Sequence, residues 1–166
     1  SWLSAAGFQF VSLDLPHYSP KRRDMAHLLA CNQVRLSIEL LNRTDEHEFG
    51  NFERCTWISQ RELQRLDPER KMHTPTAQFN TPMRGRLAIE VITEQEDVEP
   101  IMRVYAQSSA FNEVWYFALG EQLVRLDQIR EQIQKSGVDV SKIYTFNGDT
   151  ILMPVALPKR IRAKKG

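Results

Sequence analysis

Glycine and cysteine are scarce in this chain of 166 residues. None of the seven glycines fits GxGxxG or GxxxxGK[ST], the spacings at which backbone amides hold nucleotide phosphates. Cys31 and Cys55 lack the CxxC or Cys/His spacing of a zinc site and form no disulfide framework. The sequence therefore argues against a nucleotide hydrolase or a dinucleotide-binding enzyme. A reducing compartment, the cytoplasm, is the expected location.

Long apolar runs are also missing, since no stretch approaches the ~18 residues that a membrane span needs. The opening residues, SWLSAAGFQF, lack the charged start of a signal peptide and are typical of a cut inside a longer chain. We therefore expect no membrane contact, and we expect further parts of a parent protein upstream.

The composition is that of an ordinary globular domain, with 42% hydrophobic and 26% charged residues. The patterns predict an α+β fold, with a mixed or antiparallel sheet and about three helices. A short strand is expected over 8–15, and Ser19-Pro20 is a typical helix start for a helix reaching about Cys31. The alternation of apolar residues over 34–40 then predicts a strand. A single helix over 20–42 is the competing interpretation.

The next segment predicts the return arm of a hairpin over 52–58, followed by a short helix. Ser59 and Glu62 have capping-box spacing, and Asp67-Pro68 ends the helix after about two turns. Residues 69–84 contain two Thr-Pro dipeptides and few large apolar residues, so we expect an extended connector there.

The second half predicts strands over 86–93 and 101–106 joined by an acidic turn, and a central strand over 111–119 that is apolar on both faces. A helix over 121–136 follows, which Gly137 ends. Asn147-Gly148 has the left-handed preference of a type I′ turn, so a C-terminal β-hairpin is expected there. The expected organisation is an N-terminal lobe (1–68), the connector (69–84), a C-terminal lobe (85–157) and a basic tail (158–166). One single domain is the alternative.

Charge is distributed unevenly, although the net charge is only +1. Without the five cations of the tail, 17 basic residues face 21 acidic ones. A second basic group precedes the first expected helix. The candidate nucleic-acid-binding residues are Lys21, Arg22, Arg23, Lys159, Arg160, Arg162, Lys164 and Lys165. Such clusters neutralise phosphates with little sequence preference, whereas the plain alternative is a solvated helix face and a solubilising terminus.

Candidates for chemistry are weaker. The loop Asp45–Glu48 offers oxygen and imidazole ligands without calcium-loop or HExxH spacing. His17, His27 and His73 are far apart in sequence, and the carboxylates Asp14, Glu39, Glu90 and Glu113 match no nuclease spacing. The strand aromatics Trp115, Tyr116, Phe117, Tyr144 and Phe146 could stack bases but lack an RNP1-type context, so a core role is preferred.

We therefore expect a binding module rather than an enzyme, with no catalytic residues, metal or cofactor. It would be an accessory or regulatory protein that contacts nucleic acid, DNA or RNA, through its basic tail and basic helix face. Its body would contact a protein partner or a domain of the parent chain. One alternative is a structural or adaptor subunit without nucleic-acid contact, and another is a metal-dependent hydrolase that uses the Asp45–Glu48 loop.

Overall fold

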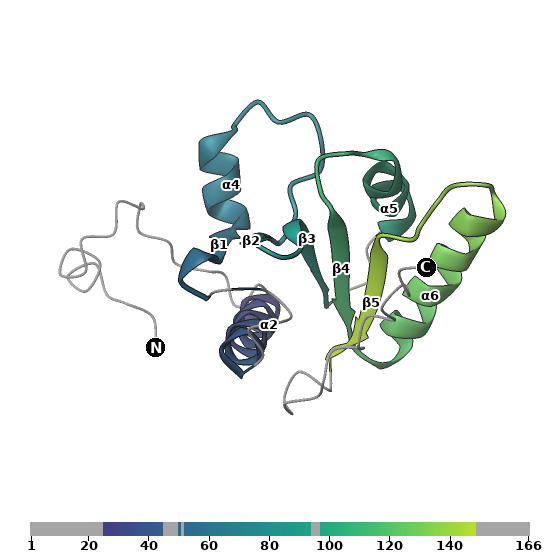
Figure 1. Cartoon of the computed structure of the whole chain (residues 1–166). Coiled ribbons are helices and arrows are strands. Elements are labelled where there is room, and N and C mark those ends of the chain that lie inside the picture. The colour runs from purple at the N-terminus through teal and green to yellow at the C-terminus, as the bar shows by residue number, and fades with distance from the viewer. Residues whose placement is uncertain (1–24, 45–49, 51, 94–96, 149–166) are drawn as a thin grey trace, which may run out of the picture.

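Five strands form one mixed sheet in the order β1-β2-β3-β4-β5 (Figure 1). The computed structural model describes residues 25–44, 50, 52–93 and 97–148. The strands are β1 (Thr56–Ser59), β2 (Ala77–Thr81), β3 (Gly85–Ile92), β4 (Glu113–Ala118) and β5 (Ile143–Asn147). The pairs β1–β2 and β2–β3 are antiparallel, whereas β3–β4 and β4–β5 are parallel. The predicted α+β class is therefore confirmed.

Helices cover both faces of this sheet (Figure 1). They are α2 (Met25–Thr44), the short 3-10 helix η2 (Phe52–Arg54), α4 (Gln60–Leu66), α5 (Val98–Gln107) and α6 (Gly120–Lys135). Helix α2 packs on β3 from one side, α5 and α6 cover the opposite face, and α4 contacts β1 and β2. The described part of the chain thus holds four α-helices, one more than the sequence predicts.

The two cores follow from the alternation of side chains along the central strands. On β3, Leu87, Ile89 and Val91 face the α2 side, and Ala88 and Ile92 face α5 and α6. All six residues of β4 are buried, because it lies between β3 and β5 and under both helix layers. Its prediction as a central strand is confirmed.

The strand predicted over 34–40 is wrong, because α2 is one continuous helix there. Val34 and Ile38, four residues apart, are the buried pair that packs on the sheet. Leu36 and Leu40, which complete the alternation, are 64% and 54% exposed. The period of two was a by-product of exposed leucines on a helix. Residues 52–58 were expected to form the return arm of a hairpin. Of that region only β1 is a strand, and it pairs with β2.

Two further predictions are wrong. Strand β2 lies inside the expected connector, where Ala77, Phe79 and Thr81 alternate with half-buried residues. The sheet therefore joins β1, which precedes residues 69–84, with β2 inside that range and with β3 to β5 after it. Helix α5 replaces the strand expected over 101–106, since Val98, Met102 and Tyr105 form a buried stripe at helical spacing.

The helix signals in the sequence were more reliable. Ser59 caps α4 by accepting from the Glu62 amide at 3.4 Å, as the capping box predicts. Helix α6 ends before Gly137, whose φ of 86° suits the chain reversal.

Only part of the predicted C-terminal hairpin lies within the described residues. Its first arm is β5, but its second arm, like the strand over 8–15 and the helix start at 19–20, lies outside the described residues. Gly148 does not take the positive φ that the predicted type I′ turn requires.

Candidate functional site

Glu90 places a carboxylate in an otherwise apolar row of β3, between Ala88 and Ile92 on the face covered by α5. The residue is only 5% exposed. Burying a carboxylate costs several kcal/mol unless hydrogen bonds and a positive or polar neighbour replace its water. The surroundings of Glu90 supply those partners.

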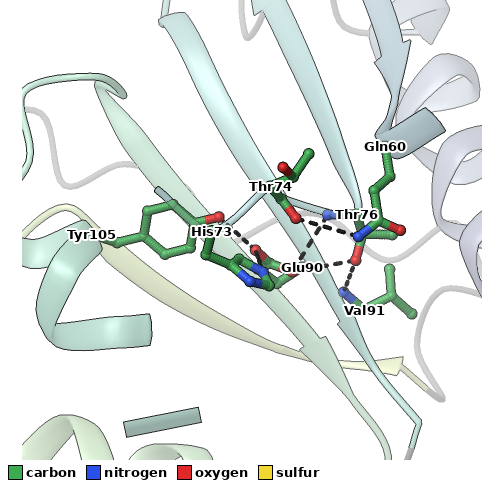
Figure 2. Close-up of polar contacts among 7 residues, drawn as sticks. All are labelled: Gln60, His73, Thr74, Thr76, Glu90, Val91 and Tyr105. Atoms are coloured by element: carbon green, nitrogen blue, oxygen red, sulfur yellow. Dashed lines mark hydrogen bonds and ion pairs between the residues drawn. The ribbon is translucent and has the colours of Figure 1, made fainter. Parts of the chain in front are cut away.

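Both carboxylate oxygens of Glu90 accept hydrogen bonds (Figure 2). Oε1 accepts from the Tyr105 hydroxyl at 2.6 Å and contacts Nε2 of His73 at 3.1 Å. Oε2 accepts from the hydroxyl of Thr76 at 3.2 Å and from its backbone amide at 3.4 Å. Burial, and then the Glu90 carboxylate, raise the pKa of Tyr105 far above its usual range, so the phenol keeps its proton and remains a donor.

The same network attaches residues 73–76 to the sheet and to α4. The Thr76 hydroxyl also accepts from the Val91 amide at 3.3 Å. Gln60 donates from its backbone amide to the Thr76 carbonyl at 2.9 Å and from its side chain to the Thr74 carbonyl at 3.3 Å. Figure 2 shows Thr76 in contact with Glu90 and Val91 of β3, and Gln60 in contact with Thr74. Glu90 therefore acts as the anchor of the segment that precedes β2.

The chemistry open to this cluster is limited by its saturation. A histidine oriented by a carboxylate resembles half of an acid–base triad, and His73 keeps 35% of its side chain exposed. However, four contacts already occupy the two oxygens of Glu90, which matches the acceptor capacity of a carboxylate. The geometry fits a structural anchor better than a reacting group.

A second buried carboxylate, Glu113, lies at the start of β4. Its Oε2 accepts from Nη1 of Arg84 at 2.8 Å and from the Trp115 indole at 2.9 Å. The Arg84 guanidinium also lies over the Trp115 ring, 5.3 Å from its centroid. This pair ties the β2–β3 turn to β4, and it cancels one positive and one negative charge inside the protein.

Two open depressions flank this turn, at the end of the sheet where the parallel strands begin. The larger, of about 600 Å³, is lined by residues of η2, the β2–β3 turn and the α5–β4 loop, namely Arg54, Asn80, Thr81, Pro82, Gly85, Arg86, Ser109, Ala110 and Asn112. The smaller, of about 420 Å³, is lined by Met83, Arg84, Asn112, Glu113, Ser141, Lys142 and Tyr144. Asn112 lines both, so the depressions are neighbours.

The charged side chains that line the larger depression, Arg54 and Arg86, are both positive. Arg54 and Arg86 are exposed, and neither has a carboxylate partner among the described residues. Arg86 donates one hydrogen bond, from Nη1 to the Ala110 carbonyl at 3.4 Å. Lys142 donates to the Ser108 carbonyl at the end of α5, and burial lowers its pKa despite the opposing effect of Asp139. The two arginines are therefore the cations best placed to meet an anion.

The predicted binding residues lie elsewhere in the chain. Lys21 to Arg23, the tail cations at 159–165 and the acidic loop Asp45–Glu48 are outside the described residues. In the described part of the chain, no group of three or more His, Cys, Asp or Glu could hold a metal ion. No helix there has both the length and the apolar character that crossing a membrane requires.

Other candidates from the sequence fall into the core. Trp115, Tyr116 and Phe117 are at most 4% exposed, as expected for core residues, whereas Tyr144 and Phe146 are half-buried. Cys31 and Cys55 form no disulfide and pack beside the α2 core, and burial raises the pKa of Cys31 to about 12. The Cys31 thiol is therefore not an activated nucleophile.

Sequence reasoning missed Arg54, Arg86 and Asn112, because single polar residues in turns carry no motif. The available signal was Gly85 between two arginines after Thr81-Pro82, which marks a tight turn with cations on it. Comparisons with protein-family models, with curated proteins and with solved structures found no match to this chain.

Proposed function

We propose that this protein is a non-enzymatic module that contacts nucleic acid, and that the two depressions beside the β2–β3 turn form part of the contact surface. The observation that carries the proposal is the pair Arg54 and Arg86, which line one open polar depression without a carboxylate partner in the described part of the chain. Arginine binds phosphate with a planar set of donors. The other lining residues are small, and four of them carry short polar side chains, which commonly contact the phosphate backbone: Asn80, Thr81, Ser109 and Asn112.

The termini extend the proposal. Lys21, Arg22 and Arg23 and the tail residues Lys159, Arg160, Arg162, Lys164 and Lys165 add eight cations that could follow a phosphate backbone. If the tail contributes, deleting 158–166 weakens binding to random DNA and RNA oligonucleotides at low salt. Unchanged binding after that deletion would remove the tail from the proposal.

A salt titration tests the role of the depressions. Arg54→Ala/Arg86→Ala should weaken binding to random oligonucleotides and lower the slope of log affinity against log salt by about 1.5, as expected for two lost phosphate contacts. The matched control is Arg65→Ala/Arg125→Ala, which removes the same charge from exposed positions on α4 and α6. Equal effects of the two double variants would refute a specific role of the depressions.

A second candidate function is that of an adaptor subunit without nucleic-acid contact. It is favoured by the leucines on the outer side of α2, since Leu29, Leu36 and Leu40 are 57%, 64% and 54% exposed. Their spacing of seven and four residues forms a stripe that a protein partner can cover. Purification with a stoichiometric partner that Leu36→Lys releases, and without nucleic-acid absorbance, would favour this candidate over the first.

A further inference from the structure

The smaller depression differs from the larger in having an aromatic residue, Tyr144, in its lining. Tyr144 on β5 is half-buried, packs against the α2 core and lines the depression. Met83, at the tip of the β2–β3 turn, is 61% exposed in the same lining. A tyrosine ring held by a core, beside a flexible thioether, is a surface on which a flat ring can stack.

Asn112 connects the two depressions chemically. Its Oδ1 accepts from the Arg86 amide at 2.9 Å, and its own backbone amide donates to the Arg86 carbonyl at 2.8 Å. Since Oδ1 is used in this way, the amide nitrogen is the part of the side chain that remains as a donor to a ligand. A cationic depression, an amide donor and an aromatic ring thus follow one another around the turn.

We propose that these depressions take up a single-stranded segment of nucleic acid, with phosphates at Arg54 and Arg86 and one unstacked base against Tyr144. The inference rests on the proposed function and names the form of nucleic acid that it selects. Every base has a face that can stack on an aromatic side chain, and a single strand can turn that face outward. A duplex keeps its base faces inside its own stack, so it can use the arginines but not the ring.

The test compares a labelled thymidine oligonucleotide of about 15 residues with a duplex of the same length, by fluorescence anisotropy on the full chain. Tyr144→Leu should weaken single-strand binding about 5- to 100-fold, the range expected for one lost stacking contact, and leave duplex binding unchanged. Tyr144→Phe keeps the ring and should bind like the parent protein. This second variant separates loss of stacking from damage to the fold.

The outcomes distinguish the two proposals. Single-strand binding that Tyr144→Leu leaves intact, or single-strand and duplex binding that it weakens equally, overturns the inference alone, provided that Arg54→Ala/Arg86→Ala still weakens both ligands. If the arginine double variant weakens neither ligand, or the parent protein binds neither, the proposed function fails together with the inference.

Discussion

Replacing Glu90 tests whether its network is the anchor that the geometry indicates. Glu90→Leu has nearly the same volume but accepts no hydrogen bond. It leaves the buried Tyr105 hydroxyl and the part-buried Thr76 amide without an acceptor, while half-exposed His73 can turn to water. Each buried unsatisfied donor costs about 1–3 kcal/mol, so we expect a loss of about 3–5 kcal/mol in the free energy of unfolding.

Glu90→Gln is the informative companion variant. Its amide oxygen can face Thr76, whose backbone amide can only donate, and its nitrogen can face the Tyr105 hydroxyl, which can rotate and accept. What Glu90→Gln still loses is the negative charge of the acceptor, which strengthens those hydrogen bonds. We therefore expect Glu90→Gln to cost about 1–2 kcal/mol, clearly less than Glu90→Leu.

Urea denaturation of the full chain, followed by circular dichroism, measures both variants against the parent protein. Tyr105→Phe completes a double-mutant cycle, and its coupling energy with Glu90→Leu should be about 1.5–3 kcal/mol, the value of a hydrogen bond to a charged group. Glu121→Gln, at an exposed position of α6, is the control for loss of a negative charge. A Glu90→Leu variant within about 1 kcal/mol of the parent protein would refute the reasoning.

Three further predictions concern neighbouring features. Arg84→Met should cost about 3–5 kcal/mol in urea unfolding, because it removes the cationic partner of the buried Glu113 carboxylate. Arg84→Met/Glu113→Gln should recover part of that loss, and no recovery would contradict the ion-pair account. Gly85→Ala should cost about 2 kcal/mol or more by the same measurement, since φ is 76° and a new Cβ would lie 2.5 Å from Oδ1 of Asn112; an unchanged midpoint would argue against this turn geometry. Because the pKa of Cys31 is raised, the unfolded thiol ionises from pH 9 while the folded thiol holds its proton to about pH 12. The free energy of unfolding therefore falls as the pH rises through that window, by up to about 1.4 kcal/mol per pH unit. Cys31→Ala should flatten that decline in denaturation measured at pH 8 to 11, and an identical decline in both proteins would exclude the thiol as its source.

The sequence by itself determined the local elements whose signals are chemical and short in range. The Ser59 cap, the central strand β4 and the helix ended by Gly137 all appear as predicted. Each depends on contacts within a few residues, or on the simple rule that a strand buried on both faces is apolar throughout.

Two segments owe their secondary structure to the elements that pack around them, and not to their local sequence pattern. Residues 34–40 fit a strand or a helix, and packing of Val34 and Ile38 on β3 makes them a helix with leucines facing outward. Residues 77–81 are short and partly polar, and pairing with β1 and β3 makes them a strand. Such segments take the structure that their neighbours can bury, which overrides local propensity.

The candidate site shows the same division more strongly. The sequence contains Glu90 and Arg86 as single residues without a motif, and folding brings each to partners far along the chain, such as Tyr105 and Asn112. A carboxylate in an apolar strand indicates only that partners must exist, because burial demands them. Which residues serve as those partners, and which arginines remain open to an anion, depends on the arrangement of the sheet and its loops.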